Sequence, residues 1–398
     1  MDTPLPGLKN LVGASFMGNS FSQRTGGKSL LAAAVLGALV AGSSLAAQPP
    51  RRAAPAAQPP AQPDFSAVQV RSKHVKGNIW VLQGAGGNVS WKDADILWVK
   101  ASGTWLADAA EKDIFVPVDL PSLHKAIAAR NFEVKPSVCS DSPLRPSIET
   151  LLHALMPHTV VVHVHAVEVL AHLVRRGFSH TLGAPPDSTI RWACVGYHKP
   201  GAALAIGIAD ALAATPGANV IFLQNHGVVI GADSVAEVDT ILQTLVAAFR
   251  VEPRRPNGAQ VPSTAIETGP DQTWRPVADP LVHQLATDPV LFERLQSAWA
   301  LYPDHVVFLG PSPLAVNDKD EFASRLRTTV PSPGVVFVRN VGVFADPTLN
   351  AGKQAQIRCY YDVLARQATD TPLSPLTESD IGELLNWDAE RYRIQIAK

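Results

Sequence analysis

The chain has 398 residues, of which 46% are hydrophobic and 17% charged, so it has ample material for one large or two smaller globular domains. Its formal net charge of −1, without basic runs or an acidic tail, argues against binding to nucleic acid or to an anionic membrane surface. Three scattered cysteines predict neither a disulfide framework nor a cysteine-based zinc site, and we expect buried, inert thiols at Cys139, Cys194 and Cys359.

The first 64 residues have the composition of an export signal followed by a linker. Two basic residues precede an apolar, Ala-rich run at 30–40, and small residues follow at 43–47, which is the order of a secretory signal peptide. The apolar run is shorter than the roughly 20 residues of a transmembrane helix. We therefore expect a signal peptide over 1–47, a Pro/Ala-rich linker over 48–64, and an exported, periplasmic protein without further membrane attachment. The alternative is an over-extended reading frame, whose product would start later and be cytoplasmic.

From about Phe65 the sequence alternates between strand-like and helix-like segments. Short apolar or β-branched runs predict strands at 75–82, 96–100, 159–165 and 220–223. Helical spacing and capping residues predict helices at 147–156, at 167–175, from Pro200, and at 233–250. This alternation predicts a layered α/β core, and we assign it to one domain over residues 65–252.

A smaller domain follows. Residues 253–276 are rich in Pro, Gly and Thr and predict a linker. Residues 277–398 contain the elements of a second, smaller α/β domain, namely helices at 290–300, 351–367 and from Ser379, and strands at 306–309 and 335–338.

The strongest chemical pattern is His163-Val164-His165, at the end of the apolar strand over 159–165. Residues i and i+2 project from the same face of a strand, about 6–7 Å apart. Two imidazoles at that spacing can converge on one cation at the usual distance of about 2.0–2.1 Å. The other interpretation is a pair of half-buried polar residues on a sheet.

His226 ends another buried strand, where Gly227 permits a tight turn. Alone it would be a structural turn residue, but with the other two histidines it predicts a catalytic metal site with an open position for substrate. Glu149 lies in the first turn of the helix predicted to begin at Ser147, just ahead of the histidine strand. It is our candidate acid/base, the alternative being an ordinary glutamate at a helix start.

Five motifs, in this order, resemble the class II aldolase/adducin family, which includes fuculose- and rhamnulose-phosphate aldolases. They are GGNVS (86–90), KASG (100–103), PSIE (146–149), PHTVVVHVH (157–165) and NHG (225–227). Two further motifs, PDHVVFLG (303–310) and NWDAERYR (386–393), resemble a subgroup with an added C-terminal domain.

The resemblance implies a three-layer α/β/α fold with a mostly antiparallel central sheet, assembled as a homotetramer. It implies zinc or a similar divalent metal on His163, His165 and His226, with Glu149 as a metal ligand that moves aside and acts as the acid/base. It also implies binding of a substrate phosphate by small residues at turns and a helix start, namely Asn88, Ser90, Ser102, Gly103 and Ser147. Ile148 replaces the second serine of the family motif, which removes one phosphate contact.

The function implied is that of a lyase of carbohydrate metabolism. A sugar phosphate or similar hydroxyketone would be cleaved by retro-aldol chemistry through a metal-stabilised enediolate, with Glu149 moving the proton at carbon. One alternative is a phosphosugar epimerase or dehydratase that uses the same metal. Another is a non-catalytic binding module like the adducin head, a role that usually goes with a degraded metal site.

Residues 65–90 also resemble the opening strands of exported metallo-β-lactamase-fold proteins. The HxHxDH metal motif of those hydrolases does not follow. The front of the chain is therefore interpreted either as a fragment joined to an aldolase-type body or as a divergent first strand.

Overall fold

The structure is a computed structural model of the chain and describes residues 86–254, 260–269, 272–326 and 334–396. The predicted signal peptide, the Pro/Ala-rich linker and the strand at 75–82 lie outside these ranges. All described residues belong to one compact unit of the chain. Within them, no helix combines the length and the apolar character that crossing a bilayer requires.

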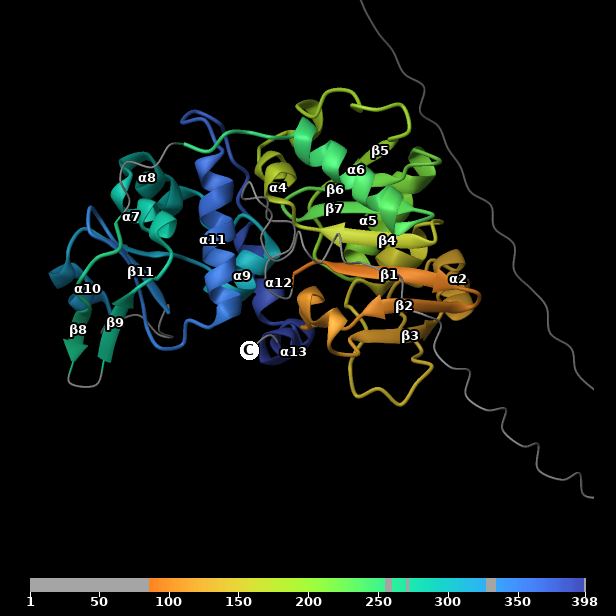
Figure 1. The fold of residues 1–398 in the computed structure, drawn as a ribbon, viewed down its shortest axis with the longest axis horizontal. Helices are drawn as coiled ribbons and strands as arrows, with labels where there is room; N and C mark the ends of the chain where they lie inside the picture. The colour runs from red at the N-terminus through yellow and green to blue at the C-terminus, as the bar shows by residue number, and fades with distance from the viewer. Residues whose placement is uncertain (1–85, 255–259, 270–271, 327–333, 397–398) are drawn as a thin grey trace, which may run out of the picture. The chain divides into compact units, whose positions relative to one another are not determined.

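A seven-stranded sheet lies at the centre of residues 86–254, in the order β3-β2-β1-β4-β7-β6-β5 (Figure 1). Its strands are β1 (Asn88–Asp93), β2 (Ile96–Lys100), β3 (Phe115–Asp119), β4 (Val160–Val164), β5 (Trp192–Val195), β6 (Val220–Leu223) and β7 (Gly227–Ala232). The sheet is mixed, because β5 runs parallel to β6 while the other neighbouring pairs run antiparallel.

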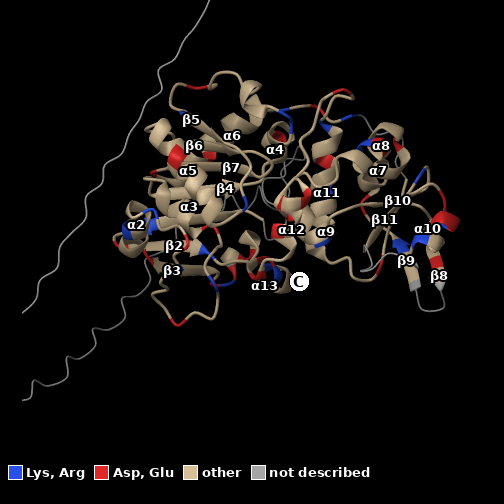
Figure 2. Ribbon diagram, turned by 180° about the vertical axis from the view of Figure 1, so that it is seen from behind, with Lys and Arg blue, Asp and Glu red and all other residues tan. Residues whose placement is uncertain are grey.

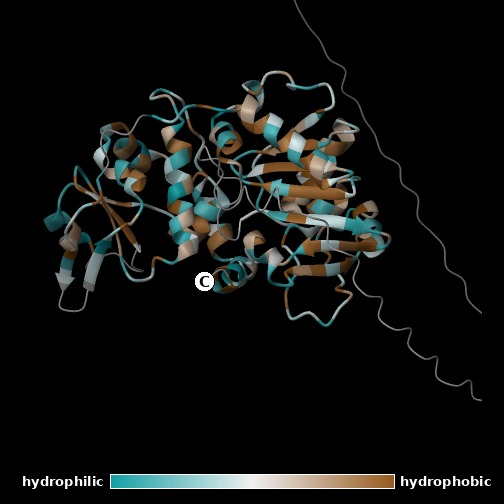
Figure 3. Ribbon diagram, viewed as in Figure 1, coloured by the Kyte–Doolittle hydropathy of each residue, from teal (hydrophilic) through white to brown (hydrophobic). Residues whose placement is uncertain are grey.

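Helices cover both faces of this sheet. Alternation along β4 shows why: Val160 and Val162 pack with residues of the helices on one face, whereas Val161 packs with those on the other. The first face is covered by α4 (Val167–Leu173) and α6 (Val235–Ala248), and the second by α2 (Leu120–Ala128), α3 (Thr150–Leu155) and α5 (Ala202–Ala214). Figure 3 shows the hydrophobic colour concentrated on the strands between them. The predicted α/β class is confirmed, but the central sheet, expected to be mostly antiparallel, is mixed.

A second sheet, of five strands in the order β10-β11-β12-β9-β8, belongs to residues 266–396, which we call the C-terminal region. Its strands are β8 (Ile266–Gly269), β9 (Gln272–Pro276), β10 (Leu314–Val316), β11 (Val335–Val338) and β12 (Gly342–Ala345). Its helices are α7 (Gln284–Thr287), α8 (Pro289–Ser297), α9 (Pro303–Leu309), α10 (Lys319–Leu326), α11 (Ala351–Ala365), α12 (Glu378–Leu385) and α13 (Asp388–Ile396). Short 3₁₀ helices occur at Leu106–Ala110, Phe178–His180 and Pro280–His283.

The C-terminal region is held to the first sheet's layers by buried polar contacts. Arg366, just after α11, lies 3.1 Å from the carboxylate of Glu168 on α4, and both side chains are buried. Gln367 donates to the carbonyl oxygen of Ala171 at 2.8 Å. Because each buried partner would be left uncompensated if the contact broke, separating α11 from α4 is costly.

Charged residues of both signs are scattered over the described elements (Figure 2). This distribution agrees with the near-zero net charge of the sequence.

Several sequence predictions are corrected by the structure. The segment at 306–309, predicted as a strand, belongs to helix α9. Residues 266–269 and 272–276, predicted as part of a linker, form β8 and β9. An apolar run that is buried on all sides has no period from which helix and strand can be told apart, and α9 is such a run. Strands β1, β3, β5, β7, β10 and β12 and helices α2, α7 and α10 were not predicted. Of the cysteines expected to be buried, Cys139 is exposed and Cys194 is only partly buried.

Candidate metal centre

Three histidines from two neighbouring strands meet in the interior. His163 lies in β4, His165 follows it, and His226 precedes β7, which pairs with β4. All three are buried, and their candidate ligand atoms lie within 4.8 Å of one another. Nε2 of His165 lies 3.1 Å from Nε2 of His163. The sequence prediction that these residues come together is therefore confirmed, and their spacing suits a single cation.

The partners of the second ring nitrogens fix which nitrogen faces the centre. Nδ1 of His163 donates to the carbonyl oxygen of Val228 at 3.2 Å, which leaves Nε2 without a proton and free to bind a cation. Nδ1 of His165 lies 3.3 Å from the carboxylate of Asp304, so Nε2 is again the nitrogen that faces the other histidines.

Gly227 provides the space for this cluster. A Cβ atom at this position would lie 2.5 Å from the carbonyl oxygen of Val164 and 2.8 Å from the ring of His165. We expected Gly227 to serve the turn through its conformational freedom, but the residue with positive φ is Asn225, at 53°. The glycine is needed for close approach, and the asparagine makes the turn.

Glu149 lies beside the triad. Its carboxylate oxygens are 3.4 Å from Nε2 of His226 and 3.6 Å from Nε2 of His163. Helix α3 begins after Glu149, and the Oγ of Ser147 accepts a hydrogen bond from the backbone N–H of Glu149 at 3.2 Å. The prediction that Ser147 caps a helix containing Glu149 in its first turn was therefore wrong, although it placed Glu149 beside the histidines correctly.

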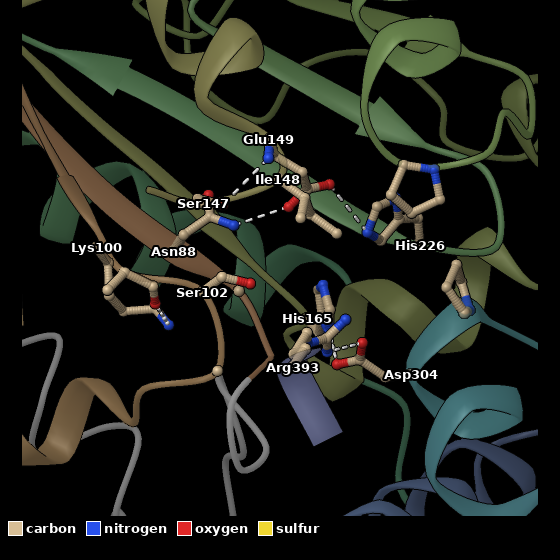
Figure 4. Close-up of a pocket in the computed structure, with 15 residues that line it drawn as sticks. Asn88, Lys100, Ser102, Ser147, Ile148, Glu149, His165, His226, Asp304 and Arg393 are labelled. Atoms are coloured by element: carbon tan, nitrogen blue, oxygen red, sulfur yellow. Dashed lines mark hydrogen bonds and ion pairs between the residues drawn. The ribbon is translucent and has the colours of Figure 1, made fainter. Parts of the chain in front are cut away.

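A chain of hydrogen bonds orients the Glu149 carboxylate. Asn88 is the cross-strand partner of His163, so its side chain shares the face of the sheet that α3 covers. Its amide donates to Glu149 at 2.8 Å, and its oxygen accepts from Nε2 of His153. The Oγ of Ser90 donates to Nδ1 of the same ring at 2.7 Å. His153 fixes which end of the Asn88 amide faces Glu149 (Figure 4 shows the Asn88–Glu149 bond).

Burial is the largest influence on the titration of these groups. It lowers the pKa of His163 to about 4 and of His226 to about 3, against the opposing effect of Glu149. Burial alone would raise the pKa of Glu149, but His163, His226 and the Asn88 amide outweigh it and lower that pKa to about 2. At neutral pH the imidazoles of His163 and His226 are thus neutral and the Glu149 carboxylate is ionised, which are the forms that bind a divalent cation.

A pocket opens beside the triad, with about 370 Å³ of space not filled by atoms. Four residues predicted to bind substrate line it, namely Asn88, Ser102, Gly103 and Ser147. The hydroxyl of Ser102 is buried and makes no hydrogen bond with the described residues. Ser90, the fifth predicted residue, does not line the pocket; it is fully buried and bonded to His153.

Sequence reasoning missed four residues of this site. Lys100 and Arg393 line the pocket with Asp304, and His153 lies behind Asn88. Burial lowers the pKa of Lys100 to about 7, with a further contribution from Arg393. His153 could have been found from its position four residues after Glu149, one helical turn away.

Residues 72–252 match the family model described as "Class II Aldolase and Adducin N-terminal domain". The match begins ahead of the described residues and includes most of the segment that also resembles metallo-β-lactamase-fold proteins. The uncharacterized oxidoreductase YuxG of Bacillus subtilis is 28% identical over 176 residues, which are 40% of this chain and 25% of that protein. The chain therefore spans a quarter of the length of this relative.

Parts of the chain are similar to two solved structures. The N-terminal class II aldolase domain of a conserved protein from Thermoplasma acidophilum is 23% identical, with a TM-score of 0.36, over 48% of this chain and 95% of that one. An L-fuculose 1-phosphate aldolase is 18% identical, with a TM-score of 0.32, over 46% of this chain and 79% of that one. The family assignment rests on the sequence match over residues 72–252.

Proposed function

We propose, from the premise that residues 72–252 belong to the class II aldolase and adducin family, that the chain is a metal-dependent lyase of aldolase type. Its substrate would be a sugar phosphate or a similar small hydroxyketone, cleaved between two carbons by the reverse of an aldol addition. The observation that carries the proposal is the position of an ionised carboxylate, Glu149, within 3.4–3.6 Å of two nitrogens of the histidine triad.

The residues present fit a divalent cation. His163, His165 and His226 would hold it, and the neutral rings of His163 and His226, with the backbone partner of the outer His163 nitrogen, favour zinc or a similar ion. A cation bound there would act as a Lewis acid toward the carbonyl and hydroxyl oxygens of a substrate.

Glu149 would take and return the proton of the cleavage reaction. A general base must be ionised and within reach of the reacting group, and Glu149 satisfies the first condition because its pKa is about 2. The bond from Asn88 holds one carboxylate oxygen and leaves the other, Oε1, without a hydrogen-bond partner among the described residues. Oε1 of Glu149 is therefore the oxygen available for proton transfer.

The pocket supports an anionic or polyhydroxylated substrate. The unbonded hydroxyl of Ser102 and the adjacent Gly103 offer hydrogen-bonding groups in a buried place, and the amine of Lys100 lines the same pocket. Ile148 lines the same pocket and offers no hydrogen bond from its side chain. These features favour a substrate with one compact anionic group.

The test combines metal analysis with product analysis. The full chain and the variants His163→Ala and Glu149→Gln are assayed for bound metal and for aldehyde release from ketose phosphates and their unphosphorylated analogues. We expect about one ion per wild-type chain, none in His163→Ala, and an intact metal site with a rate lowered about 10²–10⁴-fold in Glu149→Gln. Full lyase activity in Glu149→Gln would refute the assigned role. Epimerised or dehydrated products would assign the site to another reaction, and metal without turnover would favour a binding module.

A further inference from the structure

The C-terminal region reaches the metal centre with two charged side chains. Asp304 lies in the first turn of α9, and Arg393 lies in α13. Both are buried, both line the pocket, and they form an ion pair. In Figure 4 the two side chains point toward His165. Neither residue falls within the 72–252 match, so nothing in that family assignment accounts for them.

Asp304 contacts the outer nitrogen of a candidate ligand. One of its oxygens, Oδ2, lies 3.3 Å from Nδ1 of His165, and the other, Oδ1, accepts from Arg393. A carboxylate at Nδ1 keeps the proton on that nitrogen, turns Nε2 toward the centre, and makes Nε2 a stronger donor to a metal. His163 obtains the same orientation from a neutral backbone carbonyl, that of Val228.

Arg393 holds Asp304 in that orientation and is itself held. Its guanidinium bridges Asp304 and Glu390, with Nη1 at 3.1 Å from a Glu390 oxygen. Because two carboxylates offset the charge of Arg393, its guanidinium serves the orientation of Asp304.

We propose that Asp304 is a positioning residue of the metal centre and that Arg393 holds Asp304 in place. The C-terminal region thereby completes a site whose ligands all lie within residues 72–252. The proposal rests on the metal binding put forward above, but not on the reaction. Of the three histidines, Asp304 is paired with His165, and it acts on the metal through that ring.

The test measures metal affinity on the full chain, freed of metal and titrated with Zn²⁺ in competition with a chromophoric chelator. Asp304→Asn keeps the shape and removes the charge, while Glu390 remains as a counter-ion for Arg393, so no lone cation is left buried. We expect Asp304→Asn to weaken Zn²⁺ binding about 10–100-fold, and Arg393→Gln to weaken it less, in the same direction. The absorption spectrum of the Co²⁺-loaded protein should change in both variants.

The matched control is Asp362→Asn. Asp362 is also a buried carboxylate of the C-terminal region, paired with Arg358 and Arg366, which lie in or next to α11. We expect this variant to lower the melting temperature of the metal-free protein while keeping Zn²⁺ affinity within about twofold of wild type, whereas a merely structural role for Asp304 would make the two variants alike.

Two results would overturn the proposal: Zn²⁺ affinity of Asp304→Asn within twofold of wild type, or equal losses in Asp304→Asn and Asp362→Asn. The possible outcomes distinguish a failure of the proposed role of Asp304 from a failure of the proposed lyase activity. A wild-type chain that binds Zn²⁺ through His163 and His165 but cleaves no hydroxyketone refutes only the lyase, and the affinity comparison still decides the role of Asp304. A wild-type chain that binds no Zn²⁺ overturns both.

Discussion

The α-carbon of Gly227 faces the carbonyl oxygen of Val164 so closely that a methyl group on it would lie 2.5 Å from that oxygen. Because Gly227 has only a hydrogen atom in place of a side chain, its backbone can lie this close to the backbone of Val164. The three histidines converge on account of that approach.

Replacing Gly227 by alanine should therefore open the triad. The methyl group would also meet the rings of His165 and His163, at 2.8 and 3.1 Å, so backbone or rings must move. We expect the free energy of unfolding to fall by about 1–3 kcal/mol and bound metal to be lost. Elemental analysis and chemical denaturation measure the two effects. Gly382→Ala on α12 is the control, since a Cβ there meets nothing within 4 Å, and it should be neutral or slightly stabilising. Normal metal content in Gly227→Ala would contradict the steric argument.

Removing the Asn88 amide should change the titration of Glu149. The Asn88 bond lowers the pKa of Glu149, so its loss in Asn88→Ala raises that pKa. A base with a raised pKa is protonated at higher pH, and the acidic limb of the kcat/KM profile should move to higher pH. We also expect about 1–3 kcal/mol lower stability, because Glu149 and His153 each lose a buried partner. Ser90→Ala, one bond further away, should shift the limb less. If the acidic limb of Asn88→Ala does not move, the hydrogen bond from Asn88 has no effect on the pKa of Glu149.

The turn before His226 offers a test of how the C-terminal region is attached. The amide of Asn225 donates to the carbonyl oxygens of Leu301 and Ser374, at 2.8 and 2.7 Å. Asn225→Asp keeps the shape but places a carboxylate against two acceptors, and we expect a loss of about 1–3 kcal/mol or more in the free energy of unfolding. Asn225→Gly keeps the positive φ and should cost less than the aspartate. Denaturant titration measures the free energy of unfolding of both variants. Equal stability of Asn225→Asp and Asn225→Gly would contradict a stabilising role for the hydrogen bonds to Leu301 and Ser374.

His305 should make the fold sensitive to acid. Its ring is fully buried between Trp299 and Tyr360, with centroids 4.3 Å from each, and neither ring nitrogen makes a hydrogen bond within the described residues. Burial lowers its pKa from 6.5 to about 3, so below pH 6.5 the unfolded chain binds a proton that the folded chain does not. Stability from this group is complete above pH 6.5 and is lost as the pH falls toward 3.

Replacing His305 by phenylalanine removes this titration. The slope of unfolding free energy against pH should fall by up to about 1.4 kcal/mol per pH unit between pH 6 and 4, while the two proteins keep equal slopes above pH 7. Denaturant titrations at several pH values measure the difference. Equal slopes throughout would show that His305 is protonated, or solvated, in the folded protein.

Part of the structure of residues 86–254 could be predicted from the sequence. Strands β2 and β6 match their predicted ranges, because each is a short apolar run bounded by polar or turn residues. The histidine triad followed from the i, i+2 spacing of His163 and His165 and from a third histidine, His226, shortly after β6.

The rest depends on contacts that no local pattern encodes. Asp304 lies in a helix whose apolar residues are all buried, so its sequence does not distinguish helix from strand. Arg393 meets Asp304 only through the packing of α13 on α9, and an arginine in an exposed-looking, charged segment gives no sign of that burial. The role of Ser90 could not be predicted either. Whether a strand residue faces the pocket or a covering helix depends on how its strand pairs with its neighbours, which the sequence does not show.

The polar residues around the histidines come from widely separated parts of the chain, since Asn88 in β1 and Arg393 in α13 line one pocket. This has a consequence during synthesis on the ribosome. A nascent chain that ends before α9 can pair β4 with β7 and gather its histidines, but it has neither Asp304 nor Arg393 to place beside them. Contacts over such sequence distances form late, after the entropy of closing the long intervening loop has been overcome. The contacts that orient His165 therefore form only after residue 393 has been synthesised and has emerged from the ribosome. Until then the site lacks its final arrangement.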